Sequence, residues 1–186
     1  MLRILPTLLG KKLWLGMLRA ERRRMNPDHV AAMRSTAAHI RRVQELLVSV
    51  SRELLLRGVH HDGTKWGEHE WPYFAEATHL LADVEYGSDA YRAGLDQIRP
   101  GVERHQKTHR HHPECHPRGV LDMHLIDLVE MLADWKAAGE RTKGGGDLAL
   151  SIRINVKRFQ IPRAIADQLR ATAVALGWCH DFQWED

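Results

Sequence analysis

The sequence predicts an all-α protein, on the basis of its helical spacing, its length and the scarcity of strand patterns. The chain has 186 residues, of which 44% are hydrophobic and 27% are charged, enough to bury one core of ordinary domain size. Four segments place apolar residues three and four positions apart, the spacing that lines one face of a helix. No apolar run reaches the roughly 18 to 20 residues that a membrane-spanning helix needs.

The first predicted helix opens at Asn26-Pro27-Asp28, with proline in the first turn, and ends near Gly58. Its apolar stripe has eight members: Val30, Met33, Ala37, Ile40, Val43, Leu47, Val50 and Leu54. A second helical stretch runs from Tyr91 to His105, and we expect Pro100 to bend or split it because proline lacks a backbone N–H.

The third predicted helix contains Leu125, Leu128, Leu132 and Trp135, and the fourth runs from about Pro162 to Gly177. Between them, Ile152, Ile154 and Val156 alternate with polar residues, as they would in a short strand. Because no partner strand is visible, the prediction there is at most a small hairpin or extended segment near residues 151–157.

Residues 1–24 form a basic leader, with seven basic residues and one acidic residue, so the remaining chain has a negative net charge. The folded part therefore gives no electrostatic reason to expect DNA as its substrate. Several interpretations of the leader stay open: a disordered arm, an amphipathic helix that contacts a membrane surface or a protein, a targeting peptide, or a start of translation at Met25. The predicted organisation is this leader followed by a single helical domain over 25–186.

The two cysteines, Cys115 and Cys179, lack the paired spacing of a disulfide scaffold or a structural zinc knuckle. This pattern favours a reducing compartment, and we expect a cytoplasmic protein.

Histidines suggest a different kind of metal site. The chain has thirteen of them; His61 precedes Asp62, and five lie between His105 and His116. Imidazole nitrogens and carboxylate oxygens hold divalent transition ions while leaving positions open for water. His39 lies at the edge of the first helix's apolar stripe, where it is either a hydrogen-bonded core residue or a ligand. Lys65, three residues after Asp62, could reach a phosphate group beside a metal ion.

The order of these residues resembles a known superfamily. His39, then His61-Asp62, then the distant Asp134 on a helix is similar to the HD-domain metal-dependent phosphohydrolases. Four separated motifs also resemble a small bacterial and phage family known only as a domain of unknown function. They are His61-Asp62-Gly63-Thr64-Lys65-Trp66, Glu70-Trp71, His111-His112-Pro113-Glu114 and Glu130-Met131-Leu132-Ala133-Asp134-Trp135.

The resemblance implies an all-α, HD-like helical bundle in which His39, His61, Asp62 and Asp134 bind one divalent cation. Mn, Fe, Co, Ni and Zn all suit such a donor set. It further implies a metal-dependent phosphohydrolase that acts on a small phosphorylated substrate, a phosphate ester or nucleotide, through a metal-bound water. Asp62 could also orient the water, and Glu70, which matches the family's carboxylate, could transfer a proton.

Three further histidines, His105, His111 and His112, could bind a second ion or the substrate phosphate, or form a surface cluster without a role. Two rival functions stay open besides the hydrolase: a catalytically silent interaction module that a metal stabilises, and a peripheral adaptor that uses the basic leader. The sequence does not determine the oligomeric state, and a homo-oligomer is one of the alternatives.

Overall fold

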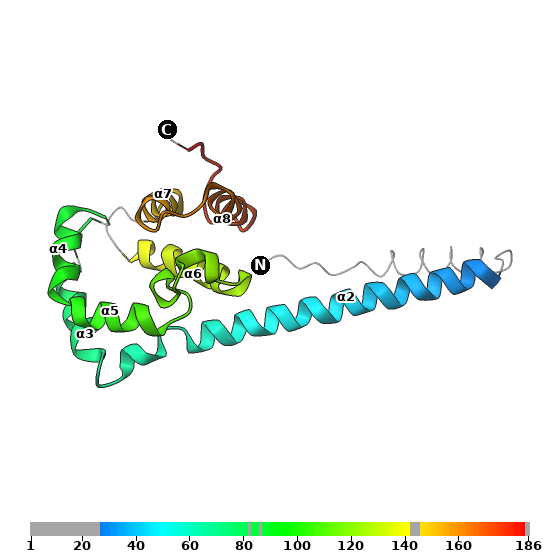
Figure 1. The fold of residues 1–186 in the computed structure, drawn as a ribbon, viewed down its shortest axis with the longest axis horizontal. Coiled ribbons are helices and arrows are strands. Elements are labelled where there is room, and N and C mark those ends of the chain that lie inside the picture. Colours follow the sequence, from blue (N-terminus) through cyan, green and yellow to red (C-terminus); the bar gives the residue numbers. More distant parts are fainter. Residues whose placement is uncertain (1–26, 82, 86, 142–145, 185–186) are drawn as a thin grey trace. The chain divides into compact units, whose positions relative to one another are not determined.

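The computed structural model describes residues 27–81, 83–85, 87–141 and 146–184, and its described elements are all helical (Figure 1). The predicted all-α class is confirmed. The α-helices are α2 (Pro27–His60), α3 (Trp71–Leu81), α4 (Asp89–Gln97), α5 (Arg99–Thr108), α6 (Leu125–Glu140), α7 (Leu148–Arg158) and α8 (Arg163–Ala175). The short 3-10 helices are η1 (Gly63–Trp66), η2 (Pro113–Cys115) and η3 (Gly119–Asp122). None of the described helices has the length and apolarity to cross a membrane.

The chain divides into two compact units, residues 1–52 and 53–186. The described part of the first unit is the portion of α2 up to Arg52. The predicted apolar stripe lies on this helix as its spacing requires, but most of its side chains are exposed, with Ile40 51% and Leu47 60% accessible. The first unit has no other described element that could cover the stripe. The leader, residues 1–24, and Met25 lie outside the described residues.

The hydrophobic core of the second unit lies among α6, α7 and α8. Met131 and Leu132 on α6, Ile152 on α7 and Ala166 on α8 are completely buried. Helix α6 begins with a capping box, in which the His124 side chain accepts a hydrogen bond from the Asp127 backbone N–H and the Asp127 side chain accepts one from the His124 N–H. This cap fixes the start of the helix that carries Asp127, Glu130 and Asp134.

Helix α7 replaces the extended segment expected near residues 151–157. Leu148, Ile152 and Asn155 share its buried face at helical spacing, and the Asp147 side chain caps the helix by accepting a hydrogen bond from the Ala149 N–H. The alternation of Ile152, Ile154 and Val156 suggested a strand. However, Ile152 and Val156 are also four residues apart, which fits a helix face equally well. Burial between α6 and α8 selects the helix.

Pro100 splits the second predicted stretch into α4 and α5, as its missing N–H requires. At the start of α5, Gly101 lies against Tyr73 of α3 so closely that a Cβ placed on it would be 2.5 Å from the Tyr73 Cβ. Only a residue without a side chain allows the two helices to approach this far. This contact holds α5, and with it His105, against α3.

Replacing Gly101 with alanine is therefore expected to destabilise the fold by about 1 to 3 kcal/mol, because the added methyl group overpacks a contact with a helix-bound side chain. Gly58→Ala is the matched control, since a Cβ there meets nothing within 4 Å. Alanine in that helical position should be neutral or stabilising by up to about 1 kcal/mol. Urea unfolding followed by circular dichroism measures both; equal stability of the two variants would contradict the close α3–α5 contact.

Candidate metal centre

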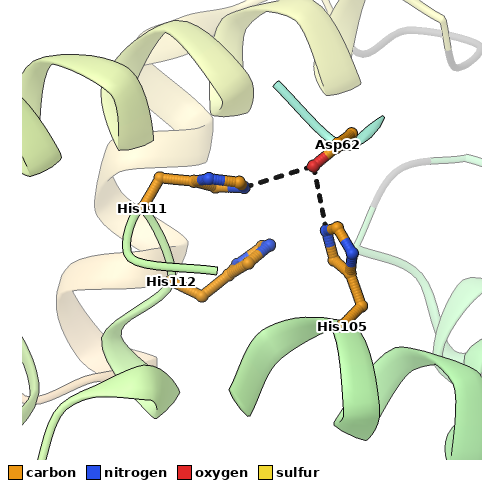
Figure 2. A group of neighbouring side chains, drawn as sticks. All are labelled: Asp62, His105, His111 and His112. Carbon is orange, nitrogen blue, oxygen red and sulfur yellow. Dashed lines mark ion pairs between the residues drawn. The ribbon is translucent and has the colours of Figure 1, made fainter. Parts of the chain in front are cut away.

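Four side chains that are distant in the sequence bring nitrogen and oxygen atoms to one place in the second unit. Asp62 lies between α2 and η1 in a left-handed conformation, with φ 55° and ψ 16°. His105 belongs to the last turn of α5, while His111 and His112 lie between α5 and η2. One donor atom from each of the four lies within 4.8 Å of the others. Figure 2 shows the imidazoles directed towards the Asp62 carboxylate.

The atoms that face one another here are buried and lack hydrogen-bond partners among the described residues: Asp62 Oδ1, His105 Nε2, His111 Nε2 and His112 Nε2. His105 Nε2 and His111 Nε2 lie 2.9 and 3.4 Å from Asp62 Oδ1, but neither contact has the geometry of a hydrogen bond. Leaving a buried polar atom unsatisfied is costly. Four such atoms around one point fit a cation as their common partner.

A second group of donors overlaps the first. His61, His111 and Asp134 also place one donor atom each within 4.8 Å of one another, and His111 is common to both groups. His61 Nε2 lies 3.4 Å from Asp134 Oδ1 and 3.4 Å from Asp62 Oδ2. The donors are imidazole nitrogens and carboxylate oxygens, which suit a first-row divalent ion such as Mn, Fe, Co, Ni or Zn.

Two glutamates contact the opposite edges of these imidazoles. Glu130 Oε1 lies 3.0 Å from His61 Nδ1 and 3.2 Å from His111 Nδ1. Glu70, which is 2% exposed, places Oε2 3.1 Å from His105 Nδ1 and accepts a hydrogen bond from the Thr64 hydroxyl at 2.8 Å. A histidine that donates its Nδ1 proton to a carboxylate presents a bare Nε2, the arrangement in which protein histidines usually bind metals.

The histidine pKa values are shifted in opposite directions across the site, upward by carboxylates and downward by burial and neighbouring imidazoles. Hydrogen bonds to Asp134 and Glu130 raise the pKa of His61 to about 10. Burial and the neighbouring His111 lower the pKa of His112 to about 3, so that this ring is neutral. Burial opposes ionisation of Asp62, but His105, His111 and Lys65 together hold its pKa well below the usual range. Without a cation, protons on imidazoles balance the ionised carboxylates, and a divalent ion could replace them.

Lys65 and a cleft complete the surroundings of the cluster. The ammonium of Lys65 lies 2.5 Å from Asp62 Oδ2 and 4.6 Å from the centre of the Phe74 ring. A cleft of about 280 Å³ reaches His61, His111 and Glu130 between the last turns of α2 and the end of α5. A larger cavity of about 660 Å³, next to the C-terminal end of α8, includes none of the clustered residues. Of these two cavities, the smaller one is lined by residues of the cluster, His61 and His111.

The structure brings together most of the residues that the sequence singled out. His61, Asp62 and Asp134 meet His105, His111 and His112, whose place in the site the sequence left open. His39 lies on the part of α2 that belongs to the first unit, is exposed there, and stays a predicted ligand. Glu70 is buried against His105.

No role was predicted for Glu130, which contacts two histidines of the cluster, or for Arg57, which contacts Glu130. Arg57 Nη1 donates hydrogen bonds to Glu130 Oε2 at 3.0 Å and to Asp127 Oδ1 at 2.9 Å. A signal for Glu130 was present, because it lies four residues before Asp134 and shares its helix face. Arg57 had none, since an arginine in the last turn of a helix is ordinarily a solvated residue.

Comparison with known proteins gives one match. The model of a family of unknown function, DUF5662, matches residues 28–175. No curated protein matches the chain, and neither does any solved structure.

Proposed function

The chain belongs to the DUF5662 family, and we propose that it is a metal-dependent phosphohydrolase acting on a phosphate ester or nucleotide. One observation carries the proposal: buried, unpartnered nitrogen and oxygen donors converge beside a lysine and an accessible cleft. A purely structural site would be closed by its protein ligands, whereas a catalytic site leaves room for water and substrate.

The residues proposed to hold one ion are His61, Asp62 and Asp134, with His111 beside them. His39, which the HD-like order implies as a further ligand, is not assigned to this ion, because it lies 22 residues before His61 and within the continuous helix α2. His105, His111 and His112 would bind a second ion or contact the substrate phosphate. A bound divalent ion would supply Lewis-acid chemistry, lowering the pKa of water and stabilising the charge on phosphoryl oxygens. A His/Asp donor set accommodates several ions, so that metal availability decides among them.

The chain's own residues provide the rest of the chemistry. Lys65 places a positive charge next to Asp62, where it can bind a phosphate oxygen as a point charge. Glu70 and Glu130 hold the Nδ1 edges of three histidines, so that the Nε2 edges stay directed at the centre. Asp62 is fixed by its left-handed turn, and His105, His111 and Lys65 together keep its carboxylate ionised. With Glu70 bound to His105 and Thr64, a positioning role is better supported for it than proton transfer.

Replacing Lys65 with alanine is expected to leave the metal content unchanged and to lower kcat/KM at least ~10-fold, because the substrate phosphate loses a cationic partner while the proposed ligands remain. Lys107→Ala is the matched control, since Lys107 is an exposed lysine of α5 that pairs with Glu103. Elemental analysis and steady-state kinetics measure the two effects. Unchanged kinetics in Lys65→Ala would remove Lys65 from the proposed mechanism.

The function itself is tested by elemental analysis of the purified full chain, coupled to a hydrolysis screen. The screen contains p-nitrophenyl phosphate, bis-p-nitrophenyl phosphate, nucleoside mono- and triphosphates and cyclic nucleotides, each with Mn, Fe(II), Co, Ni or Zn. We expect bound metal and phosphate release from at least one class. Bound metal with no hydrolysis in any combination would favour the silent module, and absence of metal binding would contradict the proposal.

A further inference from the structure

Glu130 contacts two imidazoles of the cluster on their Nδ1 side and an arginine on its other side. Its side chain is 10% exposed on α6, and its two oxygens serve different partners. Oε1 lies between His61 Nδ1 and His111 Nδ1, at 3.0 and 3.2 Å, while Oε2 accepts a hydrogen bond from Arg57 at 3.0 Å. One carboxylate oxygen thus contacts two of the imidazoles that face the cluster.

The atoms involved decide what such a carboxylate does. An imidazole that keeps its proton on Nδ1 for a carboxylate acceptor has its lone pair on Nε2. His61 belongs to one donor group and His111 to both, and their Nε2 atoms lie on the side of Asp62 and Asp134. Glu130 therefore fixes the tautomer and orientation of His61 through a hydrogen bond, and its contact with His111 Nδ1 favours the same tautomer of that ring.

Arg57 in turn restricts where Glu130 can move. Its Nη1 bonds both Glu130 Oε2 and Asp127 Oδ1, and Asp127 is fully buried. The other Asp127 oxygen accepts a hydrogen bond from Arg110 at 2.9 Å. The Glu130 carboxylate is thus tied to an ion-pair network around the buried Asp127, formed by side chains from α2, α6 and the loop after α5, which leaves Oε1 directed at the histidines.

We propose that Glu130 is the positioning residue of this metal centre, acting through His61 and His111, with Arg57 holding its carboxylate in place. The proposal rests on the proposed function, because it requires that these histidines bind metal. It adds a residue that binds neither the ion nor the substrate and yet sets the affinity for the ion.

Glu130→Gln tests this in the full chain, with Zn²⁺ as the probe. The amide keeps the size of the side chain but can no longer accept two imidazole protons on an ionised carboxylate, so zinc affinity should fall about 10- to 100-fold. Competition with a chromogenic chelator measures it. Glu140→Gln, which removes a carboxylate paired with Lys136 on the same helix, should bind zinc like the wild type.

A second readout separates positioning from general loss of structure. In the zinc-saturated wild type, ¹⁵N NMR should show His61 and His111 protonated at Nδ1 and coordinated to zinc through Nε2. In zinc-saturated Glu130→Gln, the Nδ1 protons of these two rings should exchange faster with solvent, while those of His105, which contacts Glu70, should be unchanged.

The outcomes distinguish the two proposals. A wild type that binds no zinc or other divalent ion would overturn the proposed function together with this inference. Equal zinc affinity of the wild type and Glu130→Gln would overturn the inference alone. If Glu130→Gln does not fold, Arg57→Lys serves instead, because lysine keeps the charge but has a single nitrogen, which cannot bond Glu53 as Nε does and also Glu130 and Asp127 as Nη1 does. If Arg57→Lys then bound zinc as tightly as the wild type, the proposed role of Glu130 would be overturned.

Discussion

Asp62→Asn is expected to abolish both metal binding and hydrolysis. Oδ1 of this carboxylate lies in the donor group formed with His105, His111 and His112, while Oδ2 contacts His61 and Lys65. Asparagine has the same shape but lacks the charge, so the cluster loses the anion shared by its imidazoles. The loss of metal affinity should exceed the ~10- to 100-fold typical of losing an outer hydrogen-bond partner. His61→Ala should have the same effect on both quantities.

Elemental analysis and turnover of the best substrate are the measurements for Asp62→Asn. Asp96→Asn is its control, because Asp96 is an exposed carboxylate on α4 that pairs with Arg99. Circular dichroism of both variants should show the helical content of the wild type, since Asp62 contributes nothing to the apolar core. Full metal occupancy in Asp62→Asn would contradict the ligand assignment.

Removing the metal is expected to eliminate activity while leaving the chain folded. The core among α6, α7 and α8 is formed by apolar residues such as Leu132, Ile152 and Leu169, and includes none of the proposed ligands. The ion should nevertheless stabilise the holoprotein, by about 2.7 kcal/mol when free metal is at 100 times its Kd. The elements that supply the donors, α5 and the segment between α5 and η2, should lose most of their hydrogen-exchange protection.

Chelation followed by circular dichroism, hydrogen exchange and an activity assay checks this result. Re-addition of the metal should restore turnover and raise Tm in parallel, and a non-binding ion such as Na⁺ should do neither. Global unfolding on chelation, with no turnover in the metal-loaded chain, would favour a module whose metal serves folding only.

The parts of the fold that the sequence predicts well are those in which local spacing and burial agree. Helices α6 and α8 have apolar residues at helical spacing, and Gly177 follows α8 with a positive φ of 69°, as a helix-ending glycine should. For α7 the same apolar residues fit both the two-residue period of a strand and the period of a helix, and packing against α6 and α8 favours the helix. Helix α3 was missed because Trp71 and Pro72 begin it within a polar, aromatic segment without a clear stripe.

For the site, the sequence identified residues whose type and neighbours are unusual, such as His61-Asp62 and the histidines from His105 to His112. It included Glu130 only as part of a motif and did not single out Arg57, because their roles arise from contacts with residues far along the chain: 69 positions separate His61 from Glu130, and 73 separate Arg57 from Glu130. Local patterns carry no information on such pairings. Only the packing of α6 beside the end of α2 reveals them.

The most direct test of the account is the location of the ion itself. Anomalous diffraction from crystals of the full chain loaded with Co²⁺ or Zn²⁺ should show a peak bounded by Asp62 Oδ1 and the Nε2 atoms of His105, His111 and His112, or by His61, His111 and Asp134. Peaks in both positions would mean two ions. A metal-loaded crystal with its only strong peak elsewhere on the chain would contradict the account.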